Sequence, residues 1–136
     1  MGGFPTDLAF LFFSSHYAEN AEELAAAIRQ ELSPRLLIGC TGEGIITGSE
    51  EIEATAAVTL WAAHLPGVSL TPLRLTFDQD EEGFSIDGWP GELGEGSEQP
   101  TLILLADPFS TPMDEVLSLI ADQCPGSIVI GGMAGG

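Results

Sequence analysis

Short, unbroken runs of apolar residues recur along the 136-residue chain and constrain its fold more than any other feature. Leu8–Phe13 and Leu36–Ile38 are such runs near the N-terminus, and Leu102–Ala106 and Ile128–Ile130 are such runs near the C-terminus. A strand that is apolar at every position is typical of a parallel sheet covered by helices, because neither side of the strand meets water. The runs therefore predict an α/β fold.

Each pair of apolar runs encloses a stretch with helical periodicity. Residues 18–32 carry apolar side chains every three or four positions, and residues 111–124 repeat this pattern with Thr111 as the expected N-cap residue. A glycine turn follows Ile38, and a similar one follows Ile130. We therefore expect two pseudo-repeated β-α-β units.

The middle of the chain has a different pattern. Residues 54–63 and 68–77 contain alternating apolar positions on either side of a turn, which predicts an antiparallel hairpin. An acidic, glycine-rich loop is expected at residues 78–100. It begins like a calcium-binding loop, but its twelfth position is Trp89 where that loop needs a bidentate Glu, so an EF-hand is excluded. We expect a single α/β domain over residues 1–136, with one mixed β-sheet in which the two β-α-β units bracket the hairpin.

The charge of the chain excludes several classes of function. Lys and Arg together number 3 and Asp and Glu 21, which gives a formal net charge of −18. Nucleic-acid binding and docking on anionic membranes both need clustered cations, so we expect neither. A hydrophobic fraction of 44% supplies a core and excludes an acidic disordered tail. An acidic surface keeps a protein soluble, and the absence of Lys would also suit a host with a salty cytoplasm.

The sequence carries no signature of a cofactor, a metal or an export signal. Cys40 and Cys124 are too few for a zinc site or a disulfide framework. Gly39–Gly44 lacks the lysine of a phosphate-binding loop. No basic segment with a long apolar run stands at the N-terminus, as a signal peptide or a membrane anchor would require. We therefore expect a cytoplasmic protein without a cofactor or a bound metal.

Several segments resemble, in order, the N-terminal half of a FIST domain. They are Asp7–Ser14, Ile38–Gly44, Leu60–Val68, Leu104–Ser110 and Gly131–Ala134. The resemblance covers residues 7–136 and implies a sensory input domain of a signal-transduction protein that binds a small ligand, with amino acids proposed. It transfers no catalytic residues. FIST N-terminal regions run past the point that corresponds to Gly136, so the resemblance also implies a fragment whose C-terminal partner region is missing.

Ligand contacts are expected where the parallel strands end. If both β-α-β units share one sheet, the loops after their strands meet at the edge where open α/β sheets bind ligands. Glycine N–H groups, hydroxyl groups and the carboxylate of Asp107 or Glu43 would suit a small zwitterion. The same residue types also make tight turns and helix caps, so this alternative stays open. The expected ligand-binding residues are Ser14, Ser15, His16, Cys40, Thr41, Gly42, Glu43, Asp107, Phe109, Ser110, Gly132 and Met133.

Two other classes of function stay open. Cys40 with His16 or His64 and Asp107 would supply the nucleophile, base and orienting acid of a hydrolase. A truncated sheet would leave apolar strands and edges uncovered. The chain would then act as an interaction module that forms a homodimer or docks its C-terminal partner region without a ligand.

Overall fold

The computed structural model describes residues 3, 5–91, 93 and 99–135. The chain divides into two compact units, and each is described by itself. Unit 1 comprises Met1–Thr71 with Ala134–Gly136, and unit 2 comprises Pro72–Met133. Among the described residues, no helix has the length and apolar character needed to cross a membrane.

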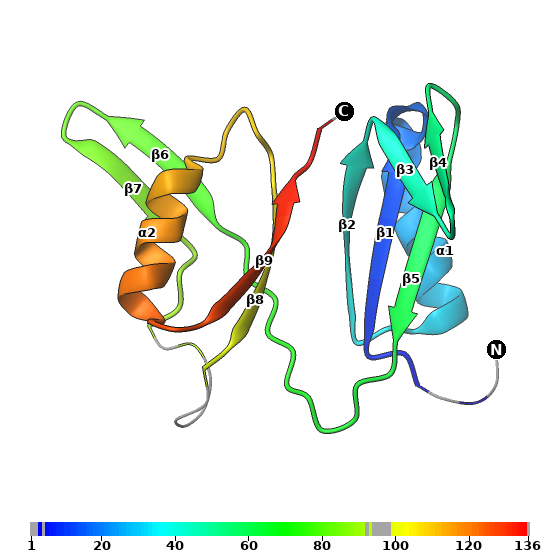
Figure 1. The fold of residues 1–136 in the computed structure, drawn as a ribbon, viewed down its shortest axis with the longest axis horizontal. Helices are drawn as coiled ribbons and strands as arrows, with labels where there is room; N and C mark the ends of the chain where they lie inside the picture. Colours follow the sequence, from blue (N-terminus) through cyan, green and yellow to red (C-terminus); the bar gives the residue numbers. More distant parts are fainter. Residues whose placement is uncertain (1–2, 4, 92, 94–98, 136) are drawn as a thin grey trace. The chain divides into compact units, whose positions relative to one another are not determined.

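Unit 1 is built around a three-stranded mixed sheet with the order β2-β1-β5. Strand β1 (Leu8–Ser14) pairs in parallel with β2 (Leu36–Gly42) and antiparallel with β5 (Val58–Ala63). The crossover from β1 to β2 holds the 3-10 helix η1 (Ser15–Asn20) and helix α1 (Ala21–Leu32). Figure 1 shows α1 against one face of this sheet.

The side chains of β1 alternate between a buried and a less buried face. Ala9, Leu11 and Phe13 are 0%, 3% and 7% exposed, as expected for the face that a helix covers. Phe10 points to the other face, where its ring lies 5.6 Å from that of Trp61 and 6.1 Å from that of Phe12. The continuous apolar run of β1 therefore supplies both the core of unit 1 and an aromatic cluster on its second face.

A short hairpin follows β2 in unit 1. Strand β3 (Gly44–Thr47) pairs antiparallel with β4 (Glu50–Glu53), and Gly48 in the turn has a φ of +62°. Ile45 is 2% exposed and belongs to the core.

The described residues of unit 2 form one hairpin and one parallel pair of strands, which can be followed in Figure 1. The hairpin joins β6 (Thr76–Asp80) to β7 (Gly83–Asp87). Strand β8 (Thr101–Ala106) pairs in parallel with β9 (Ile128–Met133), and helix α2 (Met113–Gln123) connects them. The helix buries Val116 and Ile120 at helical spacing.

The α/β class is confirmed, but the expectation of one mixed sheet is wrong. Leu8–Phe13 and Leu102–Ala106 belong to different sheets, and each pairs with the strand that follows its own helix. Unit 1 and unit 2 each hold one β-α-β connection. The pseudo-repeat and the single domain over residues 1–136 stay predictions.

The expected hairpin of residues 54–63 with 68–77 is also wrong. Strand β5 instead pairs with the buried strand β1. Pro72 interrupts the second predicted strand, and proline cannot donate a ladder hydrogen bond. Pairing with an apolar central strand has therefore replaced a local hairpin.

The acidic segment 78–100 is not a loop throughout, because its first ten residues enter the β6–β7 hairpin. Asp80 closes the turn by accepting the N–H groups of Glu82 at 2.9 Å and Gly83 at 3.0 Å. Of the rest of the predicted loop, residues 92 and 94–98 lie outside the described residues.

The second helix begins later than expected. Its N-cap residue is Pro112 rather than Thr111, and no side chain makes a cap hydrogen bond there. The carbonyl group of Asp107 instead accepts the N–H of Thr111 at 3.0 Å, which places Thr111 in the preceding turn.

Candidate functional site

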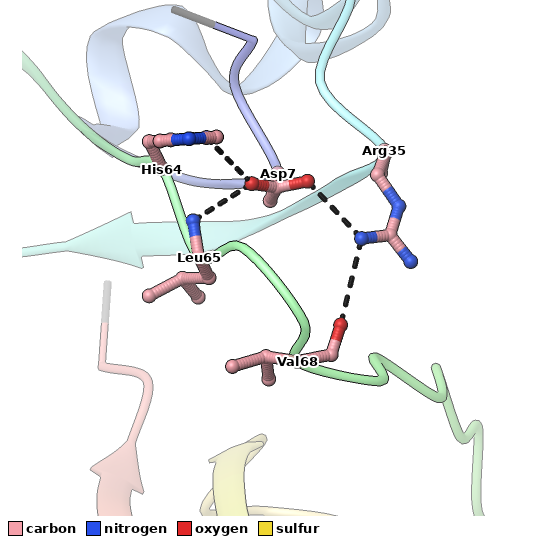
Figure 2. A network of polar contacts seen from close by, with 5 residues as sticks. All are labelled: Asp7, Arg35, His64, Leu65 and Val68. Carbon is pink, nitrogen blue, oxygen red and sulfur yellow. Dashed lines mark hydrogen bonds and ion pairs between the residues drawn. The ribbon is translucent and has the colours of Figure 1, made fainter.

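The carboxylate of Asp7 holds together a polar network that the sequence analysis missed (Figure 2). Asp7 is 5% exposed and directly precedes β1. Its Oδ2 accepts the N–H of Leu65 at 2.7 Å and lies 3.0 Å from Nδ1 of His64. Its Oδ1 accepts a hydrogen bond from Arg35 at 3.1 Å. Arg35 also donates to the carbonyl oxygen of Val68 at 3.5 Å.

This Asp7 network fastens the sheet of unit 1 at one end. The N–H of Leu65 and the guanidinium group of Arg35 hold the pKa of Asp7 below its usual value of 3.8. Arg35 directly precedes β2 and His64 directly follows β5, so the carboxylate ties both neighbours to the start of β1. We interpret the network as structural. The available signal was an acid placed directly before an apolar run.

A second polar group lies at the opposite end of the same sheet. Ser14 pairs with Gly42, because β1 and β2 are parallel and end together. The buried Ser14 hydroxyl oxygen accepts the N–H of Ala57 at 3.0 Å and lies 3.1 Å from Nδ1 of His16. A cavity of about 400 Å³ opens here. It is lined by Ser14, Ser15, His16, Gly42, Glu43, Gly44, Glu53, Ala54 and Thr55.

Unit 1 therefore brings five of the expected ligand-binding residues together, but it places two others differently. Cys40 and Thr41 lie within β2 rather than in a loop, and neither lines this cavity. Cys40 is half-buried, and burial raises the pKa of its thiol. A raised pKa disfavours the thiolate, which is the nucleophilic form.

The register of the sheet separates Cys40 from His64. Cys40 pairs with Phe12, whereas His64 follows Ala63, which pairs with Leu8. Ala63 and Cys40 are thus offset by four residues along β1, or about 13 Å at the usual rise per residue, and they lie on opposite sides of β1. His64 also contacts Asp7. The pairing of Cys40 with His64 as nucleophile and base is therefore wrong.

Unit 2 holds a larger cavity, of about 450 Å³. Its walls come from the segment leading into β6, from β8 and from α2, and Asp107, Ser110 and Thr111 supply its polar lining next to the end of β8. Asp107 is exposed, and its oxygens accept the hydroxyl of Ser110 at 2.6 Å and the N–H of Phe109 at 3.1 Å. Both bonds, that from Ser110 first, lower the pKa of Asp107. The side chain of Phe109 is 94% exposed and does not line the cavity.

The remaining expected residues of unit 2 lie beside the end of β8, where Met133 pairs with Ala106, but they do not line the cavity that Asp107 lines. Gly132 and Met133 belong to β9 rather than to a loop, and they line a separate cavity of about 280 Å³. The expectation that all these residues share one concave surface stays a prediction, because they are divided between unit 1 and unit 2. Within the described part of the chain, no three His, Cys, Asp or Glu side chains are grouped to hold a metal ion.

Comparison with protein families matches residues 7–136 to the FIST N domain. The chain belongs to the FIST N domain family. FIST domains are generally sensory domains of signalling proteins. The resemblance inferred from the sequence is thereby confirmed, and it extends over essentially the whole chain.

Relatives of this FIST N domain are longer proteins. An uncharacterized protein of Mycobacterium tuberculosis is 32% identical over 135 residues, which are 99% of this chain and 34% of the relative. An uncharacterized protein of Mycobacterium bovis is 28% identical over 136 residues, with 100% and 34% covered. The FIST N domain described here thus spans about a third of the length of these curated relatives. No solved structure matches it.

Proposed function

We propose that this FIST N domain is the input domain of a signalling protein and binds a small ligand that carries an amino group, such as an amino acid or a related metabolite. Membership of the family supports the sensory role. The observation that carries the ligand class is the carboxylate of Asp107 in the lining of the largely apolar cavity of unit 2. Ligand pockets commonly combine apolar walls with a few polar groups that fix orientation.

The chemistry of Asp107 suits an ammonium group. An Asp carboxylate is charged near neutral pH, and the hydrogen bonds from Ser110 and Phe109 favour this form by lowering the pKa of Asp107. Ser110 and Thr111 add hydroxyl groups to the same lining. In unit 1 we retain Ser14, Ser15, His16, Gly42 and Glu43 as candidate contacts, because they line one cavity. Cys40, Thr41, Phe109, Gly132 and Met133 carry less of the proposal, because they line neither of these two cavities.

A thermal-shift screen of the twenty amino acids and of small amines tests this function. Amino-bearing compounds should raise the melting temperature, because a ligand that binds only the folded state stabilises it. Asp107→Asn should weaken the shift, and Asp114→Asn is the matched control, since it removes the same charge from a residue that does not line the cavity. The proposal fails if no amino-bearing compound shifts the melting temperature of the wild type.

An interaction module is the second candidate. Trp61 is 56% exposed on the face of the unit 1 sheet that carries Phe10 and Phe12. Exposed aromatic side chains are typical of protein interfaces. The partner would be a second copy of this chain or the C-terminal region of a longer FIST protein. The interaction would take place in the cytoplasm. If the partner is a second copy, light scattering should show a homodimer that Trp61→Ser disrupts. If the chain is a monomer and responds to no ligand, docking of the C-terminal region is the form of the interaction module that is left.

A hydrolase has less support. The half-buried Cys40 thiol has a raised pKa and lies far along the sheet from His64. If the protein hydrolysed a generic ester and iodoacetamide abolished this activity, the hydrolase hypothesis would be supported.

A further inference from the structure

We propose that the cavity of unit 2 selects an apolar primary amine over the amino acid with the same side chain. This inference rests on the proposed function, because it narrows the ligand of the same site. The preference follows from the apolar walls of the cavity and from the charge of the residues that line it.

The walls of the cavity suit an apolar ligand body. Leu73 and Leu75 contribute from the segment before β6, Phe77 contributes from β6, and Val116 and Ile120 contribute from α2. Val116 and Ile120 are only 2% and 3% exposed, so the cavity reaches into the core of unit 2. At about 450 Å³ it falls within the range of small-molecule sites, roughly 300–1,000 Å³. An aliphatic or aromatic side chain would therefore be buried here.

One charge faces this cavity, and it is negative. Among the described residues of its lining, Asp107 is the sole charged side chain. Arg74 is the one basic residue in the sequence of unit 2, and it is absent from the lining although both its neighbours belong to it. Asp114 and Glu115 follow the lining residue Met113 in α2, but both are exposed and neither lines the cavity. A ligand carboxylate would thus meet the negative charge of Asp107 and find no cation in the described lining.

Asp107 retains the capacity to accept an ammonium group. A carboxylate offers about four lone-pair positions. The hydroxyl of Ser110 and the N–H of Phe109 occupy one position on each oxygen. These two bonds also fix the orientation of the carboxylate, so an arriving ammonium group meets a prepared acceptor. An amine gains this contact without bringing a carboxylate into a cavity whose described lining holds no cation.

Matched ligand pairs test the inference by isothermal titration of the full chain. Phenethylamine and phenylalanine share a benzyl group and differ by the carboxylate, and isoamylamine and leucine form an aliphatic pair. 2-Phenylethanol replaces the ammonium group of phenethylamine with a neutral hydroxyl. We expect each amine to bind at least about tenfold more tightly than its amino acid, and phenethylamine at least about tenfold more tightly than 2-phenylethanol.

Variants link the preference to the cavity. Asp107→Asn should weaken phenethylamine about tenfold and leave 2-phenylethanol unchanged, because it removes charge but keeps an oxygen for the turn. Asp114→Asn is the charge-matched control and should change phenethylamine less than about threefold. Leu73→Trp is independent of the turn and should weaken both compounds by filling space in the cavity.

The outcomes separate this inference from the proposed function. Phenylalanine binding as tightly as phenethylamine would overturn the amine preference but uphold an amino-bearing ligand. Loss of phenylalanine binding in Arg74→Gln would overturn it in the same way, because Arg74 would then serve a ligand carboxylate. If neither Asp107→Asn nor Leu73→Trp changed the affinity for phenethylamine, the amine would bind outside this cavity. That result would overturn the inference.

Discussion

Gly131 of β9 is the position where a single added carbon should do most damage. It pairs close to Leu104 of β8 and has a φ of +135°, a conformation that residues with a side chain rarely adopt. A Cβ at this position would overlap the carbonyl oxygen of Leu104 and lie 2.8 Å from both its carbonyl carbon and its nitrogen. These are backbone atoms of a paired strand, so they cannot rotate away as a side chain would.

The expected loss of stability in Gly131→Ala combines two costs. A residue forced into a sparsely populated backbone region costs about 1–3 kcal/mol. Forcing one extra carbon against fixed atoms costs a further ~1–3 kcal/mol. Alanine recovers about 0.4–1 kcal/mol by restricting the unfolded chain. The net loss is about 1–5.6 kcal/mol, compared with a total stability of about 5–15 kcal/mol for a typical folded domain.

Urea unfolding followed by tryptophan fluorescence measures this loss. In a Trp61→Phe background the remaining Trp89 reports on unit 2. Gly132→Ala is the matched control, because nothing lies within 4 Å of an added Cβ at Gly132 and its φ is not in the left-handed region. The control should unfold within about 1 kcal/mol of the background protein. Equal midpoints for Gly131→Ala and Gly132→Ala would refute the close approach of β9 to β8.

Three further predictions concern unit 1. A Cβ on Gly39 would overlap the carbonyl oxygen of Leu11, so Gly39→Ala should lower the urea midpoint, and an unchanged midpoint would contradict this register. The lowered pKa of Asp7 means that its carboxylate stabilises the fold above the usual value of 3.8 and loses this contribution as pH falls through the folded pKa. Asp7→Asn should therefore flatten the dependence of melting temperature on pH below about pH 4, and an equally steep decline in both proteins would count against the network. Because burial raises the pKa of Cys40, iodoacetamide at pH near 8 should alkylate it more slowly than a free thiol, and rapid alkylation would show an activated cysteine.

Local sequence pattern was enough to predict the apolar strands and both helices, but the expected burial of the last strand is wrong, since Ile128 and Ile130 are 63% and 52% exposed. Leu8–Phe13 and Leu102–Ala106 lie within β1 and β8, and the first helix ends at Leu32 as expected. Residues 15–20 form a 3-10 helix rather than an early turn of α1. The helical and extended periods of apolar side chains are read within a short window, which is why these elements could be predicted.

The two parallel pairs within the β-α-β connections were predicted, but the other strand pairings were not, because they depend on residues far apart in the chain. The alternating pattern of β5 fits a hairpin and the edge of a mixed sheet equally well, and its pairing with β1 spans about fifty residues. The β6–β7 hairpin did carry a local signal, in Asp80 and Gly83 at the turn. Its acidic composition favoured the interpretation as a loop.

The candidate site was predictable to the extent that it follows from parallel strands. Ser14 and Gly42 pair at one end of the sheet because the first two runs are parallel neighbours. Asp7 was missed, since the contacts of a buried acid depend on where Arg35 and His64 arrive from elsewhere in the chain. Asp107 was singled out from its motif, but the cavity beside it depends on α2 and the segment before β6.

The net charge of −18 raises the question of whether an amine would be held by the whole chain or by one carboxylate. Exposed charges are largely screened beyond about 8 Å at physiological ionic strength, so distant acids contribute little to a bound ligand. If Asp107 selects the amine by direct contact, Asp107→Asn should cost phenethylamine a similar factor at low and at high salt. If the summed field of the 21 acids dominates instead, the wild type should lose most of its affinity in high salt and Asp107→Asn should matter little at either concentration. Titration at two salt concentrations therefore decides whether the selectivity belongs to the cavity or to the composition of the chain.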